Sequence, residues 1–560
     1  MQHFVLEFSS LNGILDDSYA LDATGSGFAV AAVGFNTRVQ GIRYQTGDDQ
    51  IDGPGDITID GLPDGIPDTD SQLWDNLVTP NFGADTTAGG YKIQISSTTT
   101  APVVVAAPPG GFGTLTDTDF TSFTNGAQTH TMTFDEVGII DLEAVLLDLA
   151  NAPADYLSSN TQLTGHVRDV GRFYPATFEL SAGAILSRIQ AASTPTMMCI
   201  DPISAFTYMG EEFQVSALLE AQNALGVRTR NYVGGAGATD FAKLEAANLP
   251  EGSFFIFEEL VGVDNDLSTR RAFGTSDPDI SWPGAAIAEP NLGIGLLGGN
   301  LVFNRQADGS EDGPYITLSI GLTTSDSDGA VLELDIDLDE IGPLADDVAL
   351  VATETFRYGR LMIDNAFGPE TEDLAIPFRI EYWNGSDWAT NTLDSCTILT
   401  YDASEDDATL RSAFYVDDSW EGVLDGDSDG QDDGETVIEN AAVIADSNII
   451  ISISGGLTGE SSGVDANLDN VDDDRPLITS APGEGFEGSV LVEFNLFDPD
   501  LPYPLDFLSY DWRSTVEIDV LDEIEDGSYV NNPRGQINFG SYRGHDRVIN
   551  WQEIYIGPTP

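Results

Sequence analysis

Short runs in which apolar and polar residues alternate recur along the whole chain. Examples are Asp56–Asp60 (DITID), Ala330–Asp337 (AVLELDID) and Ser489–Leu496 (SVLVEFNL). Successive side chains of a strand point to opposite faces of a sheet, so this alternation predicts strands with one buried face and one solvent-facing face. Gly, Pro, Asn and Asp bound most of the runs, as turns between antiparallel strands require. The pattern therefore predicts an antiparallel β protein.

The predicted fold class is all-β, with several immunoglobulin-like or jelly-roll-like β-sandwich modules arranged in tandem along an elongated chain. The 560 residues include 58 glycines and 27 prolines, which suit short strands and frequent turns. Helix candidates are few. Glu136–Leu149 fits an amphipathic helix or a strand equally well, and Thr239–Leu249 fits a short helix. No repeat of fixed period is visible, which argues against a simple solenoid or propeller.

Pro/Gly-rich stretches suggest where modules meet. They are Ala101–Gly113, Asp277–Gly299 and Ile478–Gly488. Each is too short to act as a free linker, so we expect closely coupled modules. The expected modules are an N-terminal β-sandwich at 1–105, a β-rich module at 106–195, a β-sandwich at 196–300, a β-sandwich with acidic loops at 301–480, and a C-terminal β module at 481–560.

The chain is strongly acidic, with 94 acidic residues against 21 basic ones and a formal net charge of -73. Such a surface repels itself at low salt, and the repulsion weakens where the Debye length falls to about 3 Å at molar salt or where divalent ions bind. The excess indicates adaptation to a saline environment or, alternatively, an acidic secreted protein of an ordinary marine organism. Nucleic acid and anionic membrane surfaces are excluded as expected partners, because both require clustered cations.

No run of about 18 apolar residues is present, so we expect no direct membrane insertion. The first twenty residues lack a basic segment followed by an apolar one, and they begin in an alternating run. We therefore expect a mature or excised fragment. The 41% of hydrophobic residues is too high for a disordered acidic polymer and is enough for several cores.

Candidates for catalysis are few, and we expect a non-enzymatic protein with no catalytic residues. The four histidines are scattered without metal-ligand spacing, and no nucleophile elbow, phosphate-binding loop or dinucleotide fingerprint occurs. Carboxylate pairs of the glycosidase kind stay open as an alternative, because so many acids place some pair at any separation.

Alternating aspartates give the sharpest candidate site. Asp425, Asp427 and Asp429 followed by Gly430 match positions 1, 3, 5 and 6 of a calcium loop, in which alternate carboxylates face the ion. Position 12 is Thr436, where an EF-hand requires a bidentate glutamate. The spacing therefore predicts a structural Ca²⁺ site like the aspartate-rich loops of extracellular repeat proteins, with a solvated acidic turn as the alternative.

Asp433 or Glu435 would have to complete the coordination shell of this loop. Weaker calcium candidates are Thr324–Gly329 and the region from Asp48 to Asp70. Solvated acidic turns are the alternative for these as well. The second calcium candidate places oxygen ligands at alternate positions of one loop, at Asp465, Asn467, Asp469 and Asp472.

Cys199 and Cys396 are the two cysteines of the chain. In an exported protein an even pair suggests one disulfide, which by closing so long a loop would contribute about 5 kcal/mol in the entropic account. Two buried thiols are the alternative.

Three aromatic residues, Tyr382, Trp383 and Trp388, flank the turn Asn384-Gly385 and predict an aromatic hairpin. Core packing is one role for these rings. A platform on which sugar rings stack is the other, since exposed Trp and Tyr faces suit sugars.

Several longer phrases are more particular than a generic β-sandwich requires. In order they are Val170–Phe178 (VGRFYPATF), Phe206–Gly210 (FTYMG), Ala221–Gly226 (AQNALG), Asn231-Tyr232, Phe241–Leu244 (FAKL), Phe356–Leu361 (FRYGRL), Asp364–Glu370 (DNAFGPE), Arg379–Gly385 (RIEYWNG), Asp394–Thr397 (DSCT), Phe539–Ile549 and Trp551–Glu553. Together they resemble the large C-terminal region of the MSHA biogenesis protein MshQ family, from the mannose-sensitive haemagglutinin type IV pilus system, over about residues 134–553.

The resemblance implies a location more than a chemistry. MshQ-like proteins are exported, β-rich and associated with a pilus used for surface attachment, and they supply no catalytic residues. We therefore expect an extracellular, pilus-associated structural or adhesion protein. Its expected partners are pilin subunits or other pilus components, and surface glycans. The alternatives are a secreted glycan-active enzyme with β-sandwich accessory modules and a structural subunit of a surface filament or coat. Cys199 and Cys396 lie beside two of the phrases, which favours the disulfide.

Overall fold

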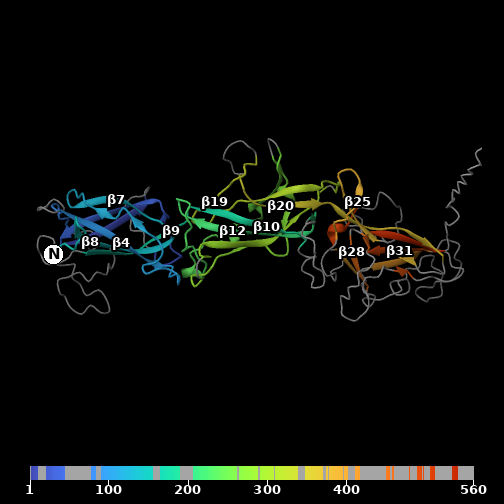
Figure 1. Cartoon of the computed structure of the whole chain (residues 1–560), viewed down its shortest axis with the longest axis horizontal. Helices are drawn as coiled ribbons and strands as arrows, with labels where there is room; N and C mark the ends of the chain where they lie inside the picture. Colours follow the sequence, from blue (N-terminus) through green and yellow to red (C-terminus); the bar gives the residue numbers. More distant parts are fainter. Residues whose placement is uncertain are drawn as a thin grey trace, which may run out of the picture.

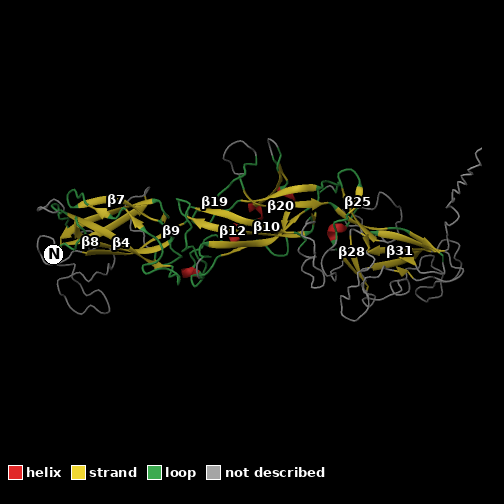
Figure 2. Cartoon of the chain, in the orientation of Figure 1, coloured by secondary structure: helices red, strands yellow, loops and turns green. Residues whose placement is uncertain are grey.

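The computed structural model shows an elongated row of three β-sandwiches (Figure 1). Among the described residues the elements are strands and short 3-10 helices, with no α-helix (Figure 2). The predicted all-β class and tandem sandwich organisation are confirmed. The structure describes residues 2–10, 20–43, 77–82, 90–154, 164–188, 206–260, 264–287, 290–307, 309–338, 347–369, 374–375, 378–394, 397–401, 410–415, 449–454, 457–458, 478–479, 488–494, 496, 505–510 and 533–539.

The first sandwich contains the strands β1 (Gln2–Ser10), β2 (Ala29–Val30), β3 (Gly34–Arg43), β4 (Tyr91–Ala101), β5 (Leu115–Thr116), β6 (Asp119–Phe120), β7 (Ala127–Phe134), β8 (Gly138–Asp148) and β9 (Thr164–Tyr174). One sheet has the order β1-β3-β7-β5 and the other the order β2-β9-β8-β4-β6. Buried side chains of both sheets meet in one core, which includes Phe35 and Val39 of β3 and Ile140 and Phe173 of the facing sheet.

The second sandwich contains the strands β10 (Thr177–Leu186), β11 (Thr207–Tyr208), β12 (Glu212–Gln222), β13 (Phe254–Glu258), β14 (Asn265–Asp266), β15 (Arg271–Phe273), β16 (Asp279–Ser281), β17 (Ile294–Phe303), β18 (Tyr315–Leu322), β19 (Val331–Leu332) and β20 (Ala349–Arg357). Its sheets have the orders β15-β17-β12-β10-β19, with β16 also on β17, and β11-β20-β18-β13-β14. Its 3-10 helices are η3 (Gly237–Thr239), η4 (Ala246–Asn248), η5 (Glu251–Ser253) and η6 (Ser268–Arg270).

The third sandwich contains the strands β21 (Gly359–Ile363), β22 (Ala366–Gly368), β23 (Leu374–Ala375), β24 (Phe378–Trp383), β25 (Trp388–Thr390), β26 (Ile398–Tyr401), β27 (Leu410–Tyr415), β28 (Ile449–Ser454), β29 (Leu457–Thr458), β30 (Ile478–Thr479), β31 (Gly488–Phe494) and β32 (Arg534–Phe539), with the 3-10 helix η7 (Asp506–Leu508). Its sheets have the orders β21-β24-β29-β28-β26, with β25 on β24, and β22-β32-β31-β27. β23 and β30 form a separate pair.

The three sandwiches share one topology. In each, the first strand pairs antiparallel with a neighbour of its own sheet: β1 with β3, β10 with β12 and β21 with β24. The chain then crosses to the facing sheet, where a short strand pairs in parallel with the last strand of the sandwich: β2 with β9, β11 with β20 and β22 with β32. Two packed sheets with these pairings are immunoglobulin-like. The repeat is thus a repeat of topology, which explains why no fixed period is visible in the sequence.

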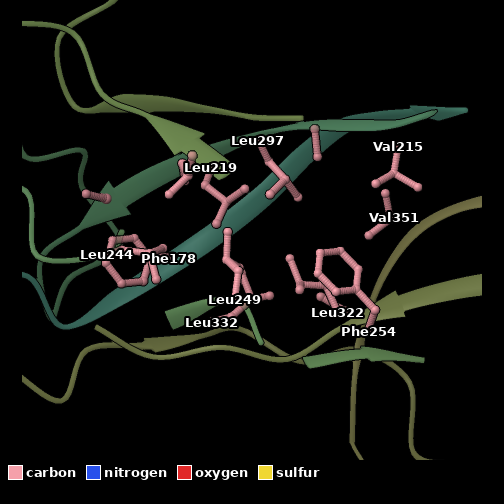
Figure 3. Close-up of a cluster of buried hydrophobic side chains, with 14 of the residues drawn as sticks. Phe178, Val215, Leu219, Leu244, Leu249, Phe254, Leu297, Leu322, Leu332 and Val351 are labelled. Atoms are coloured by element: carbon pink, nitrogen blue, oxygen red, sulfur yellow. The ribbon is translucent and has the colours of Figure 1, made fainter. Parts of the chain in front are cut away.

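Alternation in the sequence becomes alternation of burial. Along β12 the side chains of Phe213, Val215, Ala217 and Leu219 are buried, and the residues between them are more exposed. These side chains face the apolar side chains of the other sheet, among them Phe254, Leu322 and Val351 (Figure 3). Burying one such side chain stabilises the fold by roughly 1.5–3 kcal/mol, so this core is what holds the two sheets together.

The sheets divide the chain differently from the five expected modules. Strands pair across each of the four expected boundaries: β4 with β8 across residue 105, β10 with β12 across 195, β17 with β12 through 300, and β27 with β31 across 480. The links between sandwiches are instead Pro175-Ala176 and Tyr358, one or two residues long. The Pro/Gly-rich stretches at 101–113 and 277–299 lie inside sandwiches, because Gly and Pro mark turns and bends as readily as domain boundaries.

The two helix candidates are resolved by the structure. Residues 138–148 of the first candidate form β8, whose alternating burial places it in a sheet. Within the second candidate, Ala246–Asn248 forms a single 3-10 turn. Within the described residues, no helix is long and apolar enough to cross a membrane.

Candidate functional site

Several of the phrases that carry the family resemblance contain residues that lie where neighbouring sandwiches meet. We call the contact between the first and second sandwiches the first junction, and that between the second and third the second junction. Both lie along the row of sandwiches seen in Figure 1. Because the links are so short, these contacts decide how the sandwiches are oriented.

A buried arginine forms the centre of the second junction. Arg188 lies directly after β10, and its Nε donates to both carboxylate oxygens of Glu211 at 3.1 and 3.0 Å. Its Nη1 donates to Asp394 Oδ1 at 2.8 Å, and its Nη2 donates to Thr397 Oγ1 at 2.8 Å. All four side chains are buried. One guanidinium therefore binds two carboxylates, one from each sandwich, in the fork geometry that favours arginine over lysine.

Tyr208 of β11 extends this network. Its hydroxyl donates to Asp394 Oδ2 at 2.8 Å and accepts from Asn391 Nδ2 at 2.5 Å. Burial, together with the charge of Asp394, raises the pKa of Tyr208 well above its ordinary value, so the phenol stays a neutral donor. The Arg188 guanidinium also lies over the rings of Phe206 and Tyr208, 5.2 and 5.0 Å from their centroids. Such desolvated contacts between a cation and an aromatic face add to the ion pairs.

Burial and charge act in opposite directions on Glu211. Burial raises its pKa to about 7, and the positive charge of Arg188 limits the rise. The carboxylate also accepts from the backbone N–H of Tyr208 at 3.2 Å. These donors favour the charged form, so the ion pair is strongest above about pH 7 and weakens as the pH falls below it.

A second arginine joins backbone groups across the second junction. Arg305 follows β17, and its Nη1 donates to the carbonyl oxygen of Ser509 at 2.5 Å. Its Nη2 donates to the carbonyl oxygen of Gly359 at 2.8 Å, and its guanidinium lies 4.3 Å from the centroid of the Tyr358 ring. Arg305 thus fixes the one-residue link and the η7 segment to the second sandwich.

The predicted aromatic hairpin exists. Trp383 of β24 and Trp388 of β25 are paired residues, with ring centroids 5.9 Å apart and edge-to-face. Both are partly buried and pack against the core of the second sandwich. The guanidinium of Arg357 lies 4.3 Å from the Tyr382 centroid, and that of Arg360 lies 3.9 Å from a Trp388 centroid. These contacts make the three rings part of the second junction, and sugar stacking stays a proposal.

A buried carboxylate lies at the first junction. Glu136 precedes β8, and its oxygens accept from the backbone N–H groups of Val137, Arg230 and Asn231 at 2.9, 3.0 and 3.2 Å. Asn231 Nδ2 donates back to the carbonyl oxygen of Val137 at 2.9 Å. Burial raises the pKa of Glu136 to about 7, and the three backbone donors oppose that rise. Glu136 thereby links the first sandwich to backbone groups of the second.

One of the weaker calcium candidates, Thr324–Gly329, lies at the first junction and has protein partners. Asp328 forms a buried ion pair with Arg172, whose Nε donates to the carbonyl oxygen of Gly25 at 2.9 Å. Asp326 accepts from the hydroxyl of Tyr232 at 3.0 Å and from the backbone N–H of residues 328 and 330. The carboxylates of this loop therefore bind an arginine, a tyrosine and backbone groups.

The first junction also has an apolar part. Ala23, Val104, Phe112 and Val137 of the first sandwich belong to the same buried cluster as the core of the second. The loop that carries Val104 is the Pro/Gly-rich stretch 101–113, which was expected to mark a boundary near residue 105. It is instead a contact of the first sandwich with the second.

The main calcium candidates lie outside the described residues: Asp425, Asp427, Asp429, Asp433 and Glu435 of the first loop, and Asp465, Asn467, Asp469 and Asp472 of the second. Within the described ranges, no group of three or more His, Cys, Asp or Glu side chains is placed to hold a metal ion. The calcium sites stay predictions.

Cys199 and Cys396 also lie outside the described residues. Their described neighbours belong to the second junction: Thr397 directly follows Cys396, while Arg188 and Phe206 flank the segment that carries Cys199. The disulfide stays a prediction.

Sequence reasoning missed Arg188, Glu211 and Glu136 as junction residues. The scarcity of basic residues, 21 against 94 acidic ones, was a signal that could have identified Arg188. An arginine within an apolar segment, as Arg188 is within Ala-Ile-Leu-Ser-Arg-Ile, marks a place where a carboxylate is buried. Glu136 carries no such signal, because its partners are backbone N–H groups, and the two that belong to the second sandwich are 94 and 95 residues away.

Three solved structures show remote likenesses to this chain. The I-band fragment I67–I69 of titin is 6% identical over 88% of this chain and 92% of its own, with a TM-score of 0.20. The bacterial integrin-binding protein invasin is 8% identical over 90% of this chain and 77% of its own, with a TM-score of 0.16. The C-terminal domain of the Streptococcus pyogenes antigen I/II-family protein AspA is 8% identical over 59% of this chain and 97% of its own, with a TM-score of 0.18. No conclusion rests on likenesses of this size, and the curated proteins gave no match.

Family models match nearly the whole chain. They are the second domain of DUF6701 at residues 6–133, the third domain at 136–347 and the fourth at 357–554. The residues between the third and fourth matches, 348–356, form most of β20, and they end next to the second junction. The match to the third domain begins at residue 136 and therefore includes β8 and β9, which belong to the first sandwich. The chain belongs to the DUF6701 family and carries its second, third and fourth domains.

Proposed function

We propose that this chain is a non-enzymatic structural and adhesion protein of the cell surface, which holds a binding end at a distance from its point of attachment. The observation that supports this most is the pair of buried junctions. Domains joined by small polar interfaces move relative to one another by default. Here links of one and two residues are combined with buried ion pairs, so the sandwiches are held in a row.

The proposed setting is an extracellular type IV pilus system. Its support is the resemblance of phrases such as Val170–Phe178, Phe356–Leu361 and Asp394–Thr397 to MshQ-like proteins, and residues of these phrases build the two junctions. The proposed partners are pilin subunits or other pilus components, and surface glycans. Structural Ca²⁺ bound by the loops at 425–435 and 465–472 would stiffen the third sandwich by replacing carboxylate repulsion with a shared ligand.

The test is a deletion of the gene in its host, complemented with the intact chain or with Asp394→Leu. Antibodies against the chain should label intact cells, and attachment to a surface should fall on deletion and return with the intact chain. The variant Asp394→Leu should reach the surface but restore attachment less well, because the second junction is broken. Asp277→Leu, at an exposed position, is the control.

Unchanged attachment on deletion, or absence of the chain from the cell surface, would contradict the proposal. A purified chain that turns over a polysaccharide, with the activity abolished by one carboxylate substitution, would favour a glycan-active enzyme. A purified chain that polymerises and retains no glycan would favour a filament or coat subunit.

A further inference from the structure

Each sandwich contains a parallel strand pair that joins the same two places in the topology. A short strand near the start of the sandwich pairs with the last strand: Ala29 and Val30 lie beside Phe173 and Tyr174 in the first sandwich. In the second sandwich, Thr207 and Tyr208 lie beside Phe356 and Arg357. In the third, Ala366–Gly368 lies beside residues 537–539. The other pairings of the first and last strands are antiparallel, except that β10 also pairs in parallel with the two residues of β19.

The direction of these pairs decides how they respond to tension. Tension pulls the short first strand of each parallel pair toward the N-terminus of the chain and the last strand toward the C-terminus. Because the two strands run in the same direction, they must slide past each other along their length. All hydrogen bonds between them are then loaded together. An antiparallel hairpin pulled at its open end breaks one bond at a time. Breaking several bonds at once requires more force than breaking them in sequence, because each buried backbone group must lose its partner in the same step.

Backbone hydrogen bonds at these places support that geometry. In the first sandwich, the N–H of Phe28 donates to the carbonyl oxygen of Arg172, and the N–H of Ala31 donates to that of Tyr174, both at 2.8 Å. In the second, the N–H of Met209 donates to the carbonyl oxygen of Arg357 at 2.9 Å.

The junctions connect one parallel pair to the next. Arg172 in β9 forms the ion pair with Asp328 of the second sandwich. Tyr208, in β11, donates to Asp394 of the third sandwich at 2.8 Å. The strands that tension loads in one sandwich therefore carry the side chains that hold the neighbouring sandwich.

We propose that this chain bears tension along its length, with the parallel pairs β2–β9, β11–β20 and β22–β32 as the force-bearing elements of its three sandwiches. This role follows from topology and is independent of pilus association and of any ligand. Attachment that is unchanged when the gene is deleted, together with the expected mechanical strength of the purified chain, would count against the proposed function alone.

The test is single-molecule force spectroscopy on the whole chain, held by its two ends. We expect three unfolding events, each assigned to a sandwich by its gain in contour length. Ala31→Pro removes the N–H that donates to Tyr174 and should lower the unfolding force of the first sandwich only. Replacing Ala31 by lactic acid, which substitutes an ester for the amide, removes the same N–H with the side chain unchanged. This ester variant replaces Ala31→Pro in the test if the proline variant does not fold.

Thr124→Pro is the matched control. It removes an N–H that donates to the carbonyl oxygen of Ala127 at 2.9 Å, in the same sandwich but away from the parallel pair. It should leave the unfolding force unchanged, whatever it does to the denaturation midpoint. Equal losses of force in the control and in the two Ala31 variants would overturn the proposal, as would an unchanged force in all three.

Discussion

The two junctions join similar sandwiches by different chemistry. At the first junction, apolar side chains such as Val104 and Phe112 continue the core of the second sandwich, and the buried carboxylate of Glu136 is bound by backbone N–H groups. At the second junction, the contact is centred on Arg188, which binds carboxylates from both sides.

The difference shows two ways in which a very acidic chain can bury carboxylates. Backbone N–H groups stabilise the charge without a cation, and they leave Glu136 sensitive to pH because desolvation dominates. A guanidinium neutralises the charge directly, and removing Arg188 takes its positive charge away from two buried carboxylates. Burial also raises the pKa of Glu211 to about 7, so we expect both junctions to respond to pH and the second to depend in addition on the single side chain of Arg188.

The largest expected effect is that of Arg188→Leu. The substitution leaves Glu211 and Asp394 buried without their cation, which should lower the free energy of unfolding by about 3–5 kcal/mol. Denaturant titration measures the change. The control is Arg228→Leu, whose partly exposed pair with Glu220, at 4.0 Å, should contribute less than about 1 kcal/mol.

Adding Glu211→Leu and Asp394→Leu to Arg188→Leu should recover part of the loss, because no unpaired charge then stays buried. A single variant Arg188→Leu as stable as the intact chain would show that charge does not hold the second junction.

The next effect concerns the disulfide predicted between Cys199 and Cys396. Reduction, or the variant Cys199→Ala, should lower the free energy of unfolding by about 2–5 kcal/mol, because a bond near Thr397 would close a long loop across the second junction. Denaturation with and without reductant measures this, and the mass of the intact chain under non-reducing conditions reports the bond. Two free thiols in the folded chain would contradict the prediction.

A smaller effect is expected from pH at the first junction. The pKa of Glu136 rises from 4.5 to about 7 on folding, so the folded chain binds the proton more tightly than the unfolded chain. This contribution to stability is complete below about pH 4.5 and disappears as the pH rises to about 7. A shift of this size corresponds to about 3 kcal/mol.

Glu136→Gln has no proton to bind, so the difference in stability between the intact chain and this variant should change with pH between about 4.5 and 7. Comparing the two chains separates Glu136 from the many other acids. Parallel stability curves would contradict the raised pKa.

The smallest effect expected is that of calcium on the third sandwich. At a concentration of one hundred times the dissociation constant, Ca²⁺ bound to the folded chain adds about 2.7 kcal/mol. Calorimetric melting with Ca²⁺ and with EGTA at constant high ionic strength measures it. Asp427→Asn should remove the shift, whereas Asp277→Asn, an equal change of charge at an exposed position, should retain it. An unchanged melting temperature with Ca²⁺ would contradict the prediction.

Local signals in the sequence predicted some of the strands. Alternation marked β31, and the run at 330–337 contains the two residues of β19; the turn Asn384-Gly385 marked the hairpin of β24 and β25. Module boundaries were wrong because Pro/Gly-rich segments such as 101–113 occur within a sandwich, whereas the links at Pro175-Ala176 and Tyr358 are too short to have a composition of their own.

The sequence by itself determined the all-β class, the turns and the strong acidity of this protein, because each depends on neighbouring residues or on composition. Only the tertiary structure decided which carboxylates are buried and which strand closes each sandwich. Arg188 and Asp394 are 206 residues apart, and β22 pairs with a strand that begins at Arg534. Alternation specifies which face of a strand is apolar but not which strand lies beside it. That choice depends on the packing of whole sheets.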